Sequence, residues 1–599
     1  MKLNKGENIQ KKVIGSVRRT QIITTFGPGS IVNINGHSFI LAGTDFWKNS
    51  EGEKYHIYEE NLQKQLGVDY FIQPKYSDDE KYFYKKSEDI PAFVFPKTLI
   101  CSNPKCGKIA NYNSYKKGKK IKCPNCGSEN IVPSRFIMVC ENGHIDDFDY
   151  SLWVHGKQDN NCKNKRDLVM YNDKKSGGLE SIVIRCKSCG KSRSMKNAFG
   201  KEFKYKCKAK RPWLNDVDPD GCNCKSMKVS QRGSSNVYFA IHESALSIPP
   251  WSKRIQQEIS KNDRWQALKS FIDNDENLRK LIRSFKLCEK CDLTEDEVID
   301  QIKIKNQYIN GDIKVTRESI RQDEYQAFTR TLNDDNGEFQ IEESPVPNFL
   351  NKYVEKVVIA KRLREVLALT DFNRLNSNNE NSDGINKSKL SSKRLNWFPA
   401  IELRGEGIFI KLNEEKVRKW ESRPDVIERY KHIEINMEKS IFKIKNLSPR
   451  YILLHTLSHL IIKQLILQCG YSTSALKERI YSTFDKRYVE NVQDMCGILI
   501  YTATSDSEGS LGGVVSQGNP EKLENTFRSL LENASWCSSD PLCIQSSGQG
   551  FDNLNLAACY ACTLLPETSC EQRNCYLDRA ALIGSFENKD LGYFNELLC

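Results

Sequence analysis

Cysteine is the residue of this sequence that most plainly offers chemistry, and the chain contains 22 of them. Eleven lie within residues 98–224, separated by short basic segments. A second group occurs near the end of the chain in AACYACTLLPETSCEQRNCYLDRA, which contains Cys559, Cys562, Cys570 and Cys575. Thiols in such groups form disulfides, bind a metal ion or act as nucleophiles, so their spacing and compartment must decide among these uses.

The first four cysteines have the spacing of a zinc ribbon. Cys101, Cys106, Cys123 and Cys126 follow the pattern C-x4-C-x16-C-x2-C. Each pair forms a knuckle on one side of an ion, and the hairpin between the pairs brings the two knuckles together. Four thiolates then complete a tetrahedral shell, so we predict a structural zinc site here.

Two further zinc sites are predicted in the same stretch. We assign the second to a Cys2His2 set of unusual spacing, formed by Cys140, His144, His155 and Cys162. The third combines the CKSC knuckle with later thiols, namely Cys186, Cys189, Cys207 and one of the neighbours Cys222 and Cys224. Cys288 and Cys291 form one more knuckle without a second pair, so we predict that they are buried helix thiols.

Two stretches imitate catalytic motifs. CGKSRS contains the Gly-Lys-Ser of a phosphate-binding loop, but Arg185 stands where the first glycine is required, so we interpret it as a zinc knuckle. In HTLSH, His455 and His459 lie one helical turn apart, as in zinc proteases. Because Thr456 replaces the glutamate that acts as general base, packed and hydrogen-bonded histidines are favoured over ligands there.

One carboxylate pair leaves a different function open. Asp506 and Glu508, in SDSEGSLGG, follow a predicted strand, where they could hold a divalent ion for a nuclease. A solvated, glycine-rich turn is the favoured interpretation.

The charge of the chain suits a polyanionic partner. Lys and Arg outnumber Asp and Glu by 90 to 77, which gives a net charge of +13. The best local candidates for phosphate contacts lie in SYKKGKKIKC and FKYKCKAKRPW, where cations alternate with aromatics that could stack on bases: Lys116, Lys117, Lys119, Lys120, Lys206, Lys208, Lys210 and Arg211. Solvated lysines on a small zinc module are an equally good interpretation.

The remaining composition indicates a soluble, cytoplasmic protein. The mean hydropathy is -0.59, and we find neither a secretory signal nor an apolar run near the ~18 residues of a membrane span. We therefore predict no membrane partner and a reducing compartment, which argues against disulfides. Catalysis by the terminal thiols is poorly supported because no histidine lies within that stretch.

Residue patterns along the chain predict an α+β multidomain protein. We expect six parts: a β-rich region at 1–97, zinc-ribbon-like modules at 98–230, a mainly helical region at 231–372, a flexible linker at 373–395, a β-containing connection at 396–449 and an α/β zinc-binding domain at 450–599.

Several elements are predicted individually. Apolar spacing predicts helices between Trp251 and Leu350, with a capping box formed by Thr294 and Glu297. We also predict a helix at 351–369, a strand at 396–412, a buried helix at 450–470 that ends at Gly470, and a strand at 496–504.

Read together, several long segments resemble the DrmB family of the DISARM anti-phage defence system. They include RRTQIITTFGPGSIV, CENGHIDDFDYSLWVH, KRPWL, QRGSSNVYF, IELRGEGIF, HTLSHLIIKQLILQCGYSTSALKERIY and WCSSDPLC with NLAACYACTLLPETSCEQRN. The resemblance spans nearly the whole chain in the same order. Residues 450–599 are also similar to the zinc-binding domain that follows the motor in mitomycin-repair-type helicases.

The resemblance implies a non-catalytic, zinc-rich DNA-binding subunit that works with the superfamily 2 helicase DrmA on phage DNA, alongside a methyltransferase that marks host DNA. ATP hydrolysis would then belong to the helicase. The resemblance also implies a terminal zinc held by Cys559 and Cys562 with two of Cys537, Cys543 and Cys570, and Cys575 becomes the first candidate for a free thiol. A metal-dependent nuclease and a protein-only scaffold are the alternatives.

Overall fold

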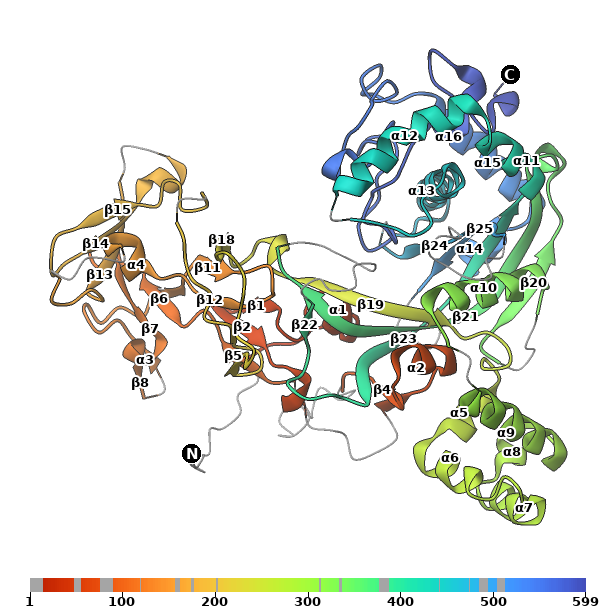
Figure 1. Ribbon diagram of the computed structural model, residues 1–599, viewed down its shortest axis with the longest axis horizontal. Helices are drawn as coiled ribbons and strands as arrows, with labels where there is room; N and C mark the ends of the chain where they lie inside the picture. The colour runs from red at the N-terminus through yellow and green to blue at the C-terminus, as the bar shows by residue number, and fades with distance from the viewer. Residues whose placement is uncertain are drawn as a thin grey trace.

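The computed structural model describes residues 14–598 except 48–54, 76–89, 119, 157–161, 174–176, 201–202, 312–313, 333–336, 376–386, 441, 473, 484–493 and 504–511. The molecule is elongated (Figure 1). A cysteine-rich lobe, residues 98–231, lies at one end, and a C-terminal domain, residues 413–598, lies at the other. A helical unit projects on the other side of the long sheet from the C-terminal domain (Figure 1). The fold is a mixture of α and β structure, as predicted.

A long mixed sheet connects these parts. Its main path is antiparallel and consists of β19 (Phe239–Leu246), β21 (Val354–Asn373), β23 (Trp397–Leu412), β25 (Cys496–Thr502) and β24 (Leu476–Ser482), in that order. β20 (Gln340–Ser344) and β22 (Ser388–Lys389) pair with β21, while β4 (Tyr70–Ile72) pairs in parallel with β23 and antiparallel with β3 (His56–Ile57). β21 has 20 residues and so spans about 65 Å, long enough to reach from the lobe into the C-terminal domain (Figure 1).

The strand β21 replaces the helix that we predicted at 351–369, so that prediction was wrong. The segment is buried on both faces for most of its length, so its apolar residues do not alternate as they do in a half-exposed strand. Two charged residues within it are buried and paired across the sheet. Arg364 donates to Glu402 at 3.0 Å, and Glu365 contacts Arg479 at 3.2 Å.

The N-terminal region packs against this sheet. It contains α1 (Arg19–Thr24), α2 (Glu60–Leu66) and a small sheet of order β1 (Ile31–Ile34), β2 (His37–Leu41) and β5 (Ala92–Val94). Ile23 and Ile40 from this region share a core with Leu369 and Phe372 of β21.

Two sheets and a few short helices form the cysteine-rich lobe. The larger sheet has the order β10 (Ile131–Pro133), β6 (Thr98–Cys101), β7 (Lys108–Asn111), β13 (Leu168–Asn172), β14 (Ile182–Cys186) and β15 (Ser192–Ser194). The smaller has the order β12 (Ile145–Asp147), β11 (Phe136–Val139) and β18 (Lys228–Gln231). Two hairpins, β8 (Lys116–Lys117) with β9 (Lys120–Ile121) and β16 (Lys210–Arg211) with β17 (Asp216–Val217), and the helices α3 (Tyr112–Tyr115) and α4 (Tyr150–His155) complete it.

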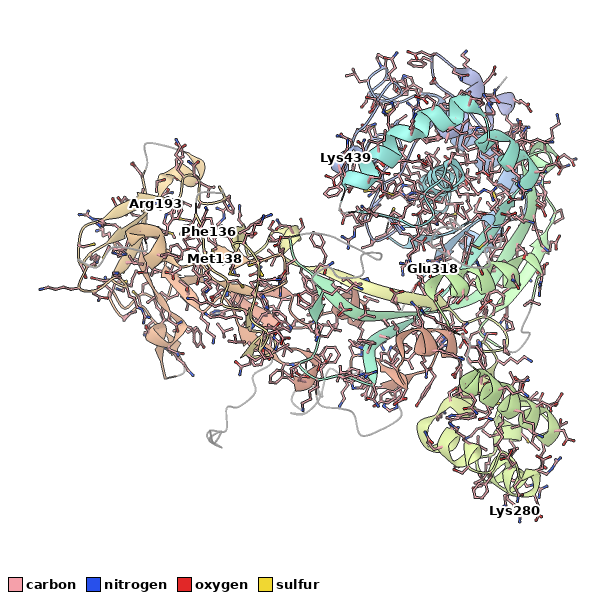
Figure 2. The ribbon with its side chains drawn as sticks, in the orientation of Figure 1. Phe136, Met138, Arg193, Lys280, Glu318 and Lys439 are labelled. Carbon is pink, nitrogen blue, oxygen red and sulfur yellow. The ribbon has the colours of Figure 1, made fainter. Side chains whose placement is uncertain are left out.

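The core of the lobe is small and is partly built from its own cysteines. Phe136 and Met138, labelled in Figure 2, pack with Trp153 and with the buried thiols of Cys140 and Cys186. The guanidinium of Arg193 lies 3.7 Å from the centre of the Trp153 ring and covers one face of that indole.

The helical unit follows β19 in the chain. It consists of α5 (Arg254–Ser260), α6 (Asn262–Lys269), α7 (Asp275–Ser284), α8 (Leu287–Cys291) and α9 (Glu295–Asn310), and α10 (Arg317–Thr329) returns the chain to the sheet. The predicted capping box is confirmed, because the Thr294 side chain accepts from Glu297 N and Glu297 accepts from Thr294 N. Cys288 and Cys291 are half-buried on α8 against the core of this unit.

The C-terminal domain surrounds one apolar helix, α13 (Pro449–Cys469). Around it lie α11 (Glu414–Glu421), α12 (Pro424–Lys439), α14 (Gly513–Gln517), α15 (Pro520–Ser535) and α16 (Ala580–Ile583), with β24 and β25 behind (Figure 1). The predicted end of this helix is confirmed, since Gly470 adopts the left-handed conformation at φ 70°. By length and composition alone α13 could cross a membrane, but 67% of its apolar window is buried within the protein, as expected of a core helix.

One arginine ties the lobe to the rest of the molecule. Arg374, at the end of β21, has no exposed surface. Its guanidinium donates to the carbonyls of Gly143 in the lobe at 2.8 Å, Val237 before β19 at 2.7 Å and Gly29 in the N-terminal region at 2.7 Å. Burial lowers its pKa to about 9.

Candidate metal centres

Apart from Cys224 and Cys570, the predicted ligands gather into four tetrads, three in the lobe and one in the C-terminal domain. Within each tetrad the donor atoms all lie within 4.8 Å of one another. We name them the ribbon site (Cys101, Cys106, Cys123, Cys126), the outer site (Cys140, His144, Cys207, Cys222), the inner site (His155, Cys162, Cys186, Cys189) and the C-terminal site (Cys537, Cys543, Cys559, Cys562).

The ribbon site has the composition that the spacing predicts. Cys101 Sγ lies 3.6 Å from Cys126 Sγ, and Cys106 Sγ lies 3.6 Å from Cys123 Sγ. Zinc–sulfur bonds of about 2.3 Å in a tetrahedron separate two sulfurs by about 3.8 Å. The thiols are therefore spaced as ligands of one ion and are too far apart for disulfides. The Asn125 side chain also donates to Cys106 Sγ at 3.2 Å.

The outer site joins two segments that are far apart in the sequence. Cys140 Sγ lies 3.4 Å from His144 Nδ1, 3.8 Å from Cys207 Sγ and 3.9 Å from Cys222 Sγ. The pairing of β11 with β18 brings these segments together. Cys224 is half-buried beside this site but outside the four-atom group, and Cys222 is the member that completes it.

A carboxylate supports the histidine of the outer site. His144 Nε2 lies 3.3 Å from Asp218 Oδ2, so the Nε2–H can donate to the carboxylate while Nδ1 faces the thiols. Histidine ligands of zinc are commonly oriented by a carboxylate in this way.

The ligands of the inner site lie in the segment between His144 and Cys207, which belong to the two halves of the outer site. Cys162 Sγ is 3.7 Å from Cys186 Sγ, and Cys189 Sγ is 3.4 Å from His155 Nε2. His155 Nδ1 lies 2.9 Å from the Ser151 carbonyl, which fixes the hydrogen on Nδ1 and leaves the lone pair of Nε2 for a metal. The antiparallel pair β13–β14 sets Cys186 next to the start of β13.

The grouping of the second and third predicted sites is therefore corrected. The structure does not combine Cys140 and His144 with His155 and Cys162, nor Cys186 and Cys189 with Cys207. Instead the first and last pairs form the outer site and the two middle pairs form the inner site. Spacing alone identifies the pairs, but only the strand pairing decides which pairs meet.

The C-terminal site uses two knuckles of the terminal domain. Cys537 Sγ lies 3.5 Å from Cys559 Sγ, and Cys543 Sγ lies 3.8 Å from Cys562 Sγ. The hydroxyl of Thr563 donates to Cys562 Sγ at 3.2 Å. The hydrogen bond from the Cys543 thiol lowers the pKa of Cys562, so one thiol of this site is readily a thiolate.

Two of the terminal cysteines lie apart from that site. Cys570 joins a separate buried group with His455, His459 and Glu478. Cys575 is buried in the main core of the C-terminal domain and joins none of the groups among the described residues. Burial raises its pKa to about 12, so it is a neutral and unreactive thiol.

Some of the predicted basic residues have exposed side chains in the lobe, whereas two others form ion pairs within it. Lys116 and Lys120 are exposed on the hairpin of the ribbon site, where Lys119 lies outside the described residues and only the backbone of Lys117 is described. Lys206 and Lys208 are exposed on either side of Cys207. Lys210 and Arg211 are engaged within the lobe: Lys210 pairs with Asp146 at 2.7 Å and Arg211 with Asp216 at 2.7 Å.

The neighbouring aromatic side chains are part of the core. Tyr115, Tyr205 and Trp213 are 0%, 4% and 1% exposed. They support the backbone beneath the lysines and do not offer faces for stacking on bases. The nuclease pair Asp506 and Glu508 lies outside the described residues.

Comparison with known proteins agrees with the geometry of these sites. Residues 457–563 match the family model of the MrfA Zn-binding domain, and this range contains all four ligands of the C-terminal site. Residues 18–239, which contain the whole lobe, match a family model described as a domain of unknown function (DUF8724). The chain is also 34% identical over 593 residues to the DISARM protein DrmB of Bacillus paralicheniformis, an alignment that covers 94% of this chain and 99% of the relative.

Proposed function

The chain belongs to the DrmB family of DISARM proteins, and we propose that it serves this defence system as a non-catalytic, zinc-stabilised subunit that binds DNA and docks onto the helicase DrmA. Zinc would fold the lobe and fix its loops. Lysines on those loops would contact phosphates, and the helicase would supply ATP hydrolysis. A methyltransferase of the same system would act on host DNA. The protein would work in the cytoplasm.

A row of lysines anchored at the outer site carries the proposal of DNA binding. Lys204, Lys206 and Lys208 are exposed, whereas the residues between them, Tyr205 and Cys207, are buried. In an extended segment this alternation places every second side chain on the same side, about 6.6 Å apart. The Lys208 ammonium lies 5.4 Å from the centre of the Tyr205 ring. The metal ligand in the middle of this segment would hold the backbone in place.

A row of this kind favours contacts with phosphates, not reading of sequence. Ammonium groups on phosphates contribute affinity without base specificity, and the aromatics beneath the row are buried. We therefore expect binding that depends on salt and little on sequence.

An exposed apolar surface beside the C-terminal site supports the proposal of a protein partner. Trp536, Leu542 and Tyr560 are 70%, 83% and 87% exposed, and each directly neighbours a ligand of that site. Large exposed aromatic and aliphatic side chains commonly anchor protein interfaces. We name this set the apolar rim and propose that it docks onto the helicase.

Titration of DNA against the full chain at several salt concentrations tests the proposed function. If three lysines contact phosphates, affinity should fall about 40-fold for duplex and about 20-fold for single strands between 50 and 200 mM salt. The measurement is fluorescence anisotropy, with the chain alone and after co-purification with the helicase. Salt-independent binding, or none in either sample, would contradict DNA binding. Magnesium-dependent cutting by the isolated chain would overturn the non-catalytic assignment and favour the nuclease.

A further inference from the structure

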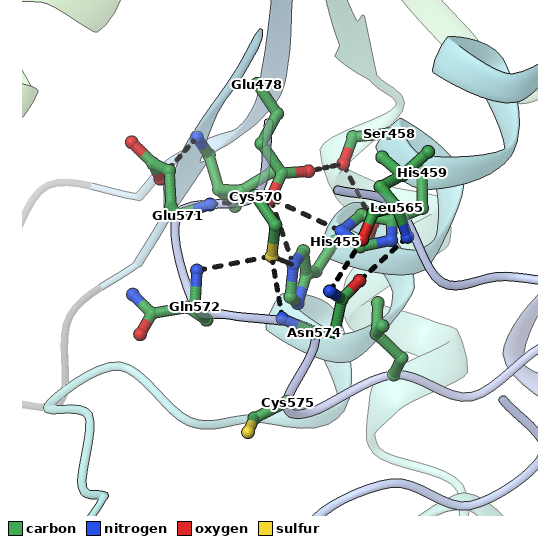
Figure 3. A network of polar contacts seen from close by, with 12 residues as sticks. His455, Ser458, His459, Glu478, Leu565, Cys570, Glu571, Gln572, Asn574 and Cys575 are labelled. Carbon is green, nitrogen blue, oxygen red and sulfur yellow. Dashed lines mark hydrogen bonds and ion pairs between the residues drawn. The ribbon is translucent and has the colours of Figure 1, made fainter. Parts of the chain in front are cut away.

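A fifth group of metal-ligand side chains is buried in the C-terminal domain. It brings together His455 and His459 from α13, Glu478 from β24 and Cys570 from the loop after the C-terminal site (Figure 3). His455 and His459 have no exposed surface, Glu478 is 2% exposed and Cys570 8%. The sequence favoured packed histidines here, and both are packed. The spacing and hydrogen bonding of the surrounding side chains, however, fit the binding of a metal ion.

The donor atoms of this group are spaced as in a metal shell. His455 Nε2 lies 3.0 Å from Glu478 Oε1 and 3.2 Å from Cys570 Sγ, and His459 Nε2 lies 3.5 Å from the same carboxylate oxygen. Ligands at about 2.05 Å from a tetrahedral ion are separated by about 3.3 Å. All four atoms lie within 4.8 Å of one another.

Hydrogen bonding alone leaves one of these atoms unsatisfied. His459 Nδ1 lies 3.1 Å from the carbonyl oxygen of Thr563, so it must carry the hydrogen. Nε2 of the same ring then presents a lone pair, and no hydrogen-bond partner reaches it from the described residues. Its neighbour is an oxygen of Glu478, which is itself an acceptor when ionised. A cation between the two would remove this conflict.

Hydrogen-bond donors point at both Glu478 and Cys570. Glu478 accepts hydrogen bonds from the Ser458 hydroxyl and from Glu571 N, the latter at 3.1 Å. Cys570 Sγ accepts from the backbone N–H groups of Gln572 at 3.3 Å and Asn574 at 3.2 Å. Donors aimed at a sulfur stabilise a thiolate, which is the form that binds metals. Burial and the nearby Glu478 carboxylate nevertheless raise the pKa of the Cys570 thiol, so a bound cation would be what holds it as a thiolate.

The same backbone pattern occurs at two of the zinc tetrads. The N–H two residues after the cysteine points at Cys207 Sγ from Ala209 at 3.3 Å and at Cys537 Sγ from Ser539 at 3.5 Å. Cys570 with Gln572 repeats it. The loop around Cys570 is thus shaped like a ligand loop.

A divalent ion would also balance the charge of this buried site. One thiolate, one carboxylate and two neutral imidazoles carry a total of −2, so a divalent cation makes the cluster neutral. Neutrality matters because an uncompensated charge in a site with so little solvent costs several kcal/mol. Two nitrogens, one oxygen and one sulfur are a donor set that suits Zn²⁺.

We propose that His455, His459, Glu478 and Cys570 form a fifth, structural metal site that binds Zn²⁺ and clamps α13 to β24 and to the terminal loop. Its four ligands would close the shell, so the ion has no position for a substrate and serves stability, not catalysis. The site goes beyond the proposed function, because neither DNA binding nor helicase docking requires it.

One residue would couple this site to the C-terminal site. Thr563 accepts from His459 through its carbonyl and donates to Cys562 Sγ through its hydroxyl. Each site therefore helps to orient a ligand of the other. Loss of zinc from one should loosen the other, since the groups that orient metal ligands commonly change affinity 10–100-fold.

The zinc content of the purified full-length chain, measured by mass spectrometry of the metal, tests this proposal. We expect five zinc ions per chain, and four in Cys570→Ser. Cys575→Ser is the matched control: it is a buried cysteine five residues away, its thiol lies apart from the cluster (Figure 3), and it should keep five.

Glu478→Gln provides a second test of the site in case Cys570→Ser does not fold. It keeps the shape of the side chain but removes its charge, so a folded protein with four zinc ions is expected. Circular dichroism and gel filtration verify the fold of each variant. Four ions in the unmodified chain, or five in a folded Cys570→Ser or Glu478→Gln protein, would overturn the fifth site.

Discussion

The cysteine-rich lobe and the C-terminal domain use similar zinc donors but differ in what surrounds them. In the lobe, the ligand cysteines are part of two cores that are much smaller than the core of the C-terminal domain. In the C-terminal domain, α13 is enclosed by helices and two strands, and the core is dominated by aliphatic and aromatic side chains. The comparison teaches that the same ligand chemistry contributes a different share of stability in each region.

The difference follows from how much apolar surface each region can bury. A small module without a large core needs the free energy of metal binding in order to fold, and this free energy is about 10–16 kcal/mol for structural zinc in small peptides. A domain with a long buried helix folds largely through apolar burial. There, zinc fixes loops and termini on a scaffold that already exists.

Removal of zinc should unfold the lobe and leave the core of the C-terminal domain folded, and this is the largest effect that we expect. A strong chelator should unfold residues 98–231, so the amides of β11, β13 and β14 should lose protection, while those of α13 remain protected. Hydrogen exchange followed by mass spectrometry measures both regions in one sample.

The control for this experiment is the same chelator saturated with zinc. A lobe that stays protected after all zinc has been removed would show that its small sheets fold without metal. Loss of α13 protection before that of the lobe would reverse the comparison.

Arg374 ties the lobe to the long sheet and to the N-terminal region, and its loss should have the second largest effect. Arg374→Leu would leave three buried carbonyls without donors, at Gly143, Val237 and Gly29. We expect destabilisation of about 3–5 kcal/mol, measured by urea unfolding. Arg232→Leu is the control, since its side chain is only half-buried and donates to the Asn33 side chain. Equal stability of the two variants would contradict the role of Arg374.

Loss of the apolar rim should affect the partner and not the fold. We expect combined substitution of Trp536, Leu542 and Tyr560 by serine to weaken binding of the helicase at least about 30-fold, which corresponds to about 2 kcal/mol. DNA binding by the isolated chain should not change, because the lysine row lies in the other region. Pull-down with the tagged helicase measures the effect, and Ile427→Ser with Val217→Ser, exposed at 52% and 56%, is the control.

Local signals in the sequence predicted the elements with clear ends. Gly470 correctly marked the end of α13. Its start lies one residue before the predicted one, because Ser448 accepts from Tyr451 N and Pro449 occupies the first turn. The run CGILIY gave β25 through its β-branched and aromatic residues. These features act over a few residues, so they can be read from the sequence.

Elements that depend on distant partners were harder to predict. β21 contains apolar runs and charged residues that fit a helix as well as a strand. The buried charges of Arg364 and Glu365 are explained by partners on other strands, Glu402 and Arg479. The identity of β21 as a strand therefore depends on β23 and β24, which lie later in the chain.

The same limit applies to the metal sites. Spacing identifies Cys186 and Cys189 as a knuckle, but the pairing of strands decides that they meet His155 and Cys162. Cys570 shows the limit most clearly, because its neighbour His455 is 115 residues away and Glu478 carries no motif. Only the packing of β24 and the terminal loop against α13 brings these residues together.

Salt-dependent DNA binding by a lysine variant tests the central claim most directly. Lys206→Gln with Lys208→Gln should reduce the slope of log affinity against log salt by about 2, with no change in stability. Lys280→Gln with Lys439→Gln removes the same charge from exposed sites on α7 and α12, far from the lobe (Figure 2), and should leave the slope nearly unchanged. Equal slopes for the two variants would contradict the claim that the zinc-anchored lysines of the lobe hold DNA.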